Sequence, residues 1–340
     1  MNMIKKFDRN SAFSINLADP GANEKGPIHS MITIEDRLFC FSEKSIKEIL
    51  TAEKIDPENE SPDTRHSFQT IYNIGTSNSF VARTIIQSNE ILNSLILKEG
   101  IDKQQILKQV WICSKLLFTC EESFHRIFTQ TSELMHQCDD LISNHKEKTF
   151  IPQLPQVVDF EQHVVSFLGH AKRCLEASHK LFCIFYNSPD FAANFKSYRD
   201  WITKNKPDCK ELIRILEQDK NWIQLIAWYR NALDANHSQP KFRVTIENFK
   251  LHNGNKFSNP SWRYDFRAKK NGDLQEVASD IITDMDIHLT NLLTFFEEIF
   301  LLCIQDNWDD RFKFRLFKHP EDKINKKCPL LYFVSLKLET

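Results

Sequence analysis

The chain has 340 residues, a length typical of one large domain with additions or of two smaller domains. Charged residues make up 26% of the sequence, but the net charge is only −2, so any nucleic acid or anionic membrane would have to be bound by a local patch. Seven glycines against 27 phenylalanines exclude a glycine-rich dinucleotide fold and favour long helices.

The nine cysteines are scattered and form no Cys-x-x-Cys pair, which predicts buried, reduced thiols in a cytoplasmic protein rather than a secreted disulfide framework. The first residues, MNMIKKFDRNSAFS, lack the apolar core of a secretory signal. The most apolar segment, residues 281–303, contains Asp284, Asp286, His288, Glu297 and Glu298. We therefore do not expect it to span a bilayer.

Residues 1–75 are predicted to form an N-terminal α+β extension. Two short apolar stretches in residues 31–41 indicate a hairpin, and residues 42–55 have the pattern of an amphipathic helix with Ser42 as its N-cap. The polar, proline-containing residues 56–67 predict an exposed loop.

Residues 76–310 are predicted to form a helical domain. Helices are expected at residues 79–100, at 102–146 and at 159–185, the last capped by Asp159. Pro189 and Pro207 bound a shorter helix, and Asp208 precedes a helix that runs to Arg230.

From residue 242 the apolar period changes to two, which predicts a strand. An Asn-Gly turn follows, and the arm that returns contains Pro260, which favours an edge position. A long helix is expected at residues 274–305, and residues 311–340 form a tail with a strand that is a candidate partner of the N-terminal hairpin. The predicted fold class is therefore mainly α: a helical bundle with long helices, the small N-terminal part, a β-hairpin at about 241–267 and the C-terminal strand.

Chemistry-bearing residues gather where the helix before residue 237 ends. Arg230 and His237 are seven positions apart, which on a helix leaves them on one face about 10 Å apart along the axis. Asn231 and Asp234 lie between them, and Asp234 can orient either side chain. Residues 230–270, which we call the basic region, contain nine Lys or Arg and three acids, a net charge of +6.

A second arginine and histidine at similar spacing, Arg173 and His179, lie in the middle of a predicted helix and about 120° apart around it. This second pair is therefore interpreted as ordinary surface and core. The first pair differs because an asparagine follows its arginine and the basic region follows its histidine.

The segment Arg230-Asn231-x5-His237 resembles the signature of the HEPN domain family of helical bundles, over about residues 76–308. The resemblance implies a metal-independent endoribonuclease that needs no cofactor and works as a homodimer, with a toxin-like or phage-defence role in bacteria. It implies His237 as acid or base, Arg230 as phosphate clamp, Asn231 as polar orienter and Asp234 as histidine positioner. The substrate would be tRNA or mRNA, with a cognate antitoxin as a further partner and no membrane.

The basic region supplies the expected RNA contacts. Lys241, Arg243, Arg263 and Arg267 would bind the backbone, and Trp262 would stack on a base. Two alternatives remain open: a non-catalytic HEPN-like scaffold that binds a nucleotide, RNA or a protein partner, and a purely structural set of capping and ion-pairing residues. His163, His170 and Cys174 also share a helical face, but no fourth zinc ligand is evident.

Overall fold

The computed structural model describes residues 26–61, 63–144, 153–191, 194–233, 242–252, 256–267 and 274–336. By packing, the chain divides into two compact units. Unit 1 comprises residues 1–114 and 307–340, and unit 2 comprises residues 115–306. The boundaries expected at residues 75 and 310 stay a prediction, because packing does not say which parts fold independently.

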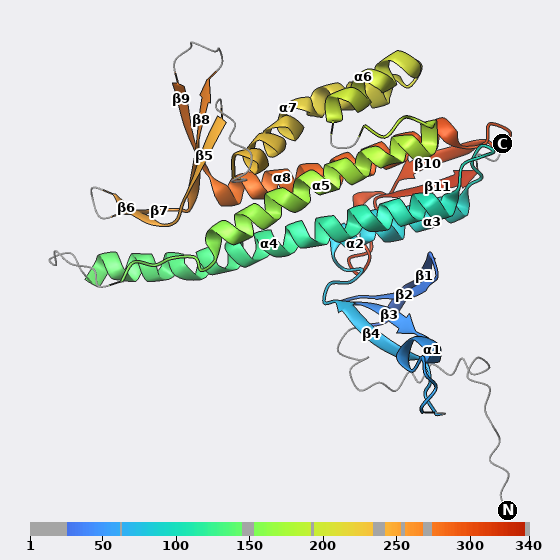
Figure 1. Cartoon of the computed structure of the whole chain (residues 1–340), viewed down its shortest axis with the longest axis horizontal. Coiled ribbons are helices and arrows are strands. Elements are labelled where there is room, and N and C mark those ends of the chain that lie inside the picture. Colours follow the sequence, from blue (N-terminus) through green and yellow to red (C-terminus); the bar gives the residue numbers. More distant parts are fainter. Residues whose placement is uncertain are drawn as a thin grey trace, which may run out of the picture. The chain divides into compact units, whose positions relative to one another are not determined.

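Unit 1 contains an antiparallel four-stranded sheet in the order β1-β2-β3-β4 (Figure 1). Its strands are β1 (Ile28–Ile34), β2 (Arg37–Ser42), β3 (Ile46–Leu50) and β4 (Ser67–Tyr72). Phe39, Phe41 and Ile46 are fully buried, and the Phe39 ring lies 5.1 Å from that of Trp111. This sheet therefore has a hydrophobic core of its own.

Helices and a second sheet complete unit 1. Its helical elements are α1 (Ala52–Ile55), α2 (Ser79–Val81), the π-helix η1 (Ala82–Ile86), α3 (Gln87–Ser94), the first part of α4 (Lys103–Asn144) and the 3₁₀ turn η2 (Glu321–Lys323). The strands β10 (Phe314–Lys318) and β11 (Tyr332–Leu336) pair with each other. The Gln87 Oε1 accepts hydrogen bonds from the backbone N–H groups of Leu331 and Tyr332, which ties β11 to the helices.

Unit 2 is built mainly of long helices. They are the remainder of α4, α5 (Phe160–Tyr186), α6 (Phe195–Asn205), α7 (Lys210–Leu233) and α8 (Ile281–Asn307). The helix α5 packs against α7, and α6 packs against both (Figure 1).

A three-stranded antiparallel sheet in the order β5-β8-β9 interrupts the helices of unit 2, between α7 and α8 in the sequence. Its strands are β5 (Phe242–Glu247), β8 (Ser261–Arg267) and β9 (Leu274–Asp280), and a small hairpin of β6 (Lys250–His252) and β7 (Lys256–Ser258) lies between β5 and β8 in the sequence. The strand β5 also packs against α7, the helix that ends at the predicted motif.

The predicted fold class, a mainly α helical bundle, is wrong. The protein is a mixed α and β structure, with a four-stranded sheet in one unit and a three-stranded sheet among the long helices of the other. Residues 42–55 show the reason. The spacing of Ile46, Ile49 and Leu50 fits a helix, but these residues form β3, and only the four residues of α1 are helical. Pairing with β2 and β4 overrides the local pattern.

Three further elements, β8, β9 and β11, differ from the expectation. Residues 274–280 form β9 rather than the first turns of the last helix, which begins at Ile281. Pro260 immediately precedes β8, and β8 is the central strand of its sheet rather than an edge strand. The C-terminal strand β11 pairs with β10 instead of with the N-terminal hairpin.

The helices of 8 residues or more were predicted more closely. The expected helices at 102–146, at 159–185 and at 208–230 correspond to α4, α5 and α7. The end of the expected helix at 79–100 differs, because α3 ends at Ser94 and Leu95 is extended.

One helix, Ile281–Asn307, is long and apolar enough to cross a membrane by length and composition alone. Its most apolar window is 67% buried within the structure, as expected for the core helix of a soluble protein. All nine cysteines are free, and seven of them are buried; Cys183 and Cys209 are the two that are partly exposed.

Candidate functional site

The last turn of α7 carries the first two residues of the predicted motif. Arg230 is half-buried there, and its Nη1 donates to the Oδ1 of Asn231 at 3.5 Å. A cation in the last turn of a helix is stabilised by the partial negative charge of the helix C-terminus. Asp234, His237 and Lys241 lie outside the described residues, so the pairing of Arg230 with His237 stays a prediction.

The residue before the motif anchors this end of α7 in the core. Tyr229 is buried and stacks on Trp262 of β8, with ring centroids 4.4 Å apart and an interplanar angle of 24°. The indole Nε1–H of Trp262 donates to the Oδ2 of Asp284 at 2.7 Å. Trp262 is fully buried, so its expected role in stacking on an RNA base does not fit this arrangement.

Two arginines of the basic region, Arg243 and Arg263, lie on one face of the β5-β8-β9 sheet. Arg243 and Arg263 are both exposed, and the register pairs Thr245 with Arg263 on the same face as Arg243. Glu247 forms ion pairs with Arg263 at 3.3 Å and with Lys250, which offsets part of the positive charge counted from the sequence. Arg267 lies in β8, but its side chain is not described.

A cavity of about 380 Å³ lies between α5, α6 and α7, and Asn231 is part of its wall. It brings the predicted motif together with residues that sequence reasoning did not connect to it. The polar and aromatic side chains that matter most are Lys172, Glu176 and His179 of α5, Asn194 and Phe195 at the start of α6, and Asn231 of α7.

His179 is the residue of this cavity that sequence reasoning missed. It was interpreted as ordinary core, and it is indeed buried, with 1% of its side chain exposed. Neither of its ring nitrogens has a hydrogen-bond partner among the described residues. The signal that identifies it is three-dimensional, because the wall comes from three segments spread between residues 172 and 231 in the sequence.

A second cavity, of about 300 Å³, lies between α7 and α8. Asp219 and Glu298 line it, and burial raises the pKa of both carboxyl groups, with the nearby Asp219 raising that of Glu298 further. Arg214 also lines the cavity and opposes the shift of Glu298. Two interacting acids with raised pKa values suit proton exchange, but nothing in the described residues indicates which ligand they would bind.

The possible zinc ligands on α5 do not form a site in the part of the chain that the structure describes, where no group of three or more His, Cys, Asp or Glu side chains could hold a metal ion. The His170 Nδ1 instead lies 2.7 Å from the backbone oxygen of Ser166, and Cys174 is buried.

Comparison with known proteins adds no relative: no family model, no curated protein and no solved structure matches this chain. A function can therefore be inferred only from the residues themselves, and the HEPN resemblance stays a hypothesis about residues 230–237.

Proposed function

We propose that the protein is an endoribonuclease of the HEPN type that acts at the C-terminal end of α7. The observation that supports the proposal is the placement of Arg230 and Asn231 on the last turn of a long, well-anchored helix. Arg230 is only half-buried there, so an RNA phosphate can reach its guanidinium.

The proposed chemistry is attack of a ribose 2′-hydroxyl on the adjacent phosphorus, without a metal or other cofactor. His237 exchanges the protons, because imidazole titrates near neutral pH, and Arg230 binds the phosphate and stabilises the charge of the transition state. Asn231 orients the arginine, consistent with the hydrogen bond between the two side chains, and Asp234 positions His237.

One histidine per chain supplies either the base or the acid in a single turnover. A symmetric homodimer would bring a second His237 to the same phosphate and supply both. We propose that the dimer works in the cytoplasm of a bacterium on tRNA or mRNA as a toxin-like or phage-defence nuclease. A cognate antitoxin would restrain it, and no membrane would be involved.

The test is cleavage of total tRNA and of a long mRNA by the purified protein in the presence of a metal chelator. We expect cleavage by the wild type and loss of at least about 100-fold of the rate in His237→Ala and in Arg230→Ala. Arg173→Ala and His125→Ala are the matched controls, since both are exposed residues of unit 2 outside the motif, and both should cleave like the wild type. Circular dichroism verifies that every variant is folded.

The rival is a non-catalytic HEPN-like scaffold that binds a nucleotide, RNA or a protein partner. Two observations weaken the RNA contacts expected for either function: Trp262 is buried, and Arg263 and Lys250 pair with Glu247. Wild-type protein that binds RNA but leaves it intact would establish the scaffold and refute the nuclease. Equal cleavage by the wild type and by His237→Ala would refute the proposed site at the end of α7.

A further inference from the structure

The cavity between α5, α6 and α7 has an aromatic floor. The ring of His179 lies 5.1 Å from that of Phe195 and 5.2 Å from that of Tyr198, measured between centroids. The ring centroids of Phe182 and Phe295 lie 6.1 and 6.0 Å from that of His179. The aromatic side chains that line the cavity itself are His179, Phe191 and Phe195, and aromatic walls favour a planar ring as the ligand.

The polar atoms of His179 have no partner in this floor. Burial lowers the pKa of His179 to about 3, so its ring is neutral at physiological pH and offers one N–H donor and one acceptor. Neither nitrogen is hydrogen-bonded to a described residue, although the side chain is almost completely buried. Buried polar groups are nearly always satisfied, so a ligand of the cavity that reached these nitrogens, which are closed to solvent in the unliganded chain, would resolve the exception.

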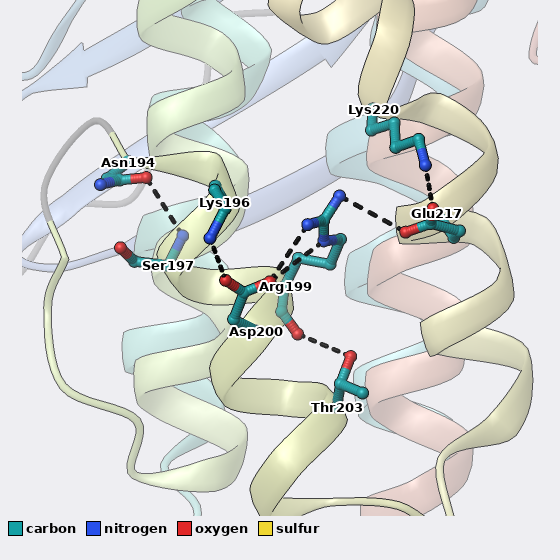
Figure 2. Close-up of polar contacts among 8 residues, drawn as sticks. All are labelled: Asn194, Lys196, Ser197, Arg199, Asp200, Thr203, Glu217 and Lys220. Atoms are coloured by element: carbon teal, nitrogen blue, oxygen red, sulfur yellow. Dashed lines mark hydrogen bonds and ion pairs between the residues drawn. The ribbon is translucent and has the colours of Figure 1, made fainter.

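Among the described residues that line the cavity, the cationic side chains are Lys172 and Lys196 and the anionic one is Glu176, which gives a net charge of +1. Lys172 is the more enclosed of the two lysines, with 24% of its side chain exposed against 75% for Lys196. The ammonium of Lys172 lies 3.7 Å from Glu176, and that of Lys196 donates to Asp200 at 2.6 Å (Figure 2).

The start of α6 adds to the positive potential at this wall. Asn194 caps the helix by accepting a hydrogen bond from the N–H of Ser197 (Figure 2). Asn194, Phe195 and Lys196 all line the cavity. The positive end of the helix dipole favours an anionic group there. Because the net charge of the walls is only +1, a carboxylate monoanion balances it better than a phosphate monoester, which carries nearly two charges at neutral pH.

We propose that this cavity binds a small aromatic carboxylate whose ring bears a hydroxyl or an N–H group. The carboxylate pairs with Lys172 beside the start of α6, the ring packs on Phe195, and the ring substituent hydrogen-bonds to His179. The volume of about 380 Å³ is sufficient for one such molecule. The site does not depend on RNA cleavage, because it uses neither Arg230 nor His237.

Isothermal titration calorimetry on the full chain tests each part of the ligand separately. The probe is 4-hydroxyphenylacetate, compared with phenylacetate, which lacks the hydroxyl, and with 4-methylphenol, which lacks the carboxylate. We expect the probe to bind with a dissociation constant below about 1 mM. Each truncated compound should bind about tenfold more weakly, because phenylacetate leaves His179 without a partner and 4-methylphenol forms no ion pair with Lys172.

Two variants assign these losses to residues. Lys172→Gln should weaken binding of the probe about tenfold while leaving 4-methylphenol unaffected. His179→Phe should remove the preference for 4-hydroxyphenylacetate over phenylacetate. It should also raise the melting temperature of the unliganded protein by about 2 °C or more, because two unsatisfied polar atoms are removed from the core. Lys204→Gln, on an exposed part of α6, is the matched control and should bind like the wild type.

The proposal is overturned if neither 4-hydroxyphenylacetate nor indole-3-acetate binds. It is also overturned if Lys172→Gln and His179→Phe, both folded by circular dichroism, bind the probe as the wild type does. Adenosine monophosphate is the last compound to be titrated. Tighter binding of this dianion than of the aromatic carboxylates would refute the preference for a monoanion. A loss of RNA cleavage in His237→Ala with unchanged binding of the probe would leave this site standing beside the nuclease.

Discussion

Two buried ionisable side chains, Glu48 in unit 1 and His179 in unit 2, differ in whether the fold supplies them with hydrogen-bond partners. Glu48 of β3 is 4% exposed, and its carboxylate accepts a hydrogen bond from the Nε of Arg37 at 2.8 Å and a second from Nη2 of the same guanidinium. Lys54 adds an ion pair at 3.7 Å. His179 of α5 is 1% exposed, and neither of its ring nitrogens has a partner among the described residues.

Glu48 is a structural polar group, whereas His179 is a candidate group for binding a ligand. The carboxylate of Glu48 is satisfied within the fold, and its hydrogen bonds to Arg37 lower its pKa. It therefore holds two neighbouring strands in register and leaves nothing for a ligand to bind. The unsatisfied ring nitrogens of His179 lower the stability of the unliganded protein. This residue lies in the wall of a cavity. The unsatisfied group, rather than the charged one, indicates where to search for a function.

The largest effect is expected at a third buried polar group, Trp262, which is satisfied by Asp284. Trp262→Ala removes a fully buried ring and its stack on Tyr229, and we expect a loss of about 3–5 kcal/mol of unfolding free energy in urea. Trp262→Phe keeps most of the apolar area but leaves Asp284 without the indole donor, and it should cost only about 1–2 kcal/mol. A loss below about 1 kcal/mol for Trp262→Ala would show that this ring is not part of the core.

The sequence predicted the long helices well and the sheets poorly. The helices α4, α5 and α7 have apolar residues at helical spacing over many turns, so the local pattern and the tertiary packing agree. The strands β3 and β9 are short, and their local patterns suit a helix as well as a strand. Only pairing with β2 and β4, or with β8, determines their conformation.

The candidate site could be predicted from the sequence only in part. The position of Arg230 and Asn231 at the end of a helix followed from helical periodicity and from the proline beyond it. The cavity did not follow, because three helices that are separated in the sequence enclose it. The burial of Trp262 was also missed, since a tryptophan between a serine and an arginine in a strand gives no local sign of which face is covered.

The unpaired state of His179 should appear in the pH dependence of stability. Burial holds its folded pKa near 3, below the usual 6.5, so the unfolded chain binds a proton first as the pH falls. Stability is therefore fully present above pH 6.5 and falls by about 1.4 kcal/mol per pH unit below it. Burial also lowers the pKa of His288, which contributes to the same window in every variant.

Urea denaturation at several values between pH 6.5 and pH 4.5 measures this slope. His179→Phe should reduce the slope by close to one proton, while His125→Phe, at an exposed position of α4, should leave it unchanged. An equal slope in the wild type and in His179→Phe would mean that His179 is protonated or hydrogen-bonded in the folded protein, and the contrast with Glu48 would disappear.

The smallest effect is expected at Glu48, the satisfied member of the pair. Glu48→Gln removes the charge that Arg37 and Lys54 share, but both of these side chains are nearly half exposed and water replaces part of the interaction. We expect a loss of about 1 kcal/mol at neutral pH. Because the folded pKa of Glu48 is depressed, this contribution is present above the usual 4.5 and is lost as the pH falls through the folded pKa.

The matched control for Glu48→Gln is Glu122→Gln, which breaks the exposed pair with Arg126 on α4 and should change stability by less than about 0.5 kcal/mol. Denaturation at neutral pH and below pH 4.5 distinguishes the two variants. If Glu48→Gln were as mild as this control at neutral pH, the buried ion pair would add nothing to the stability of unit 1. Glu48 and His179 would then differ only in whether they bind a ligand.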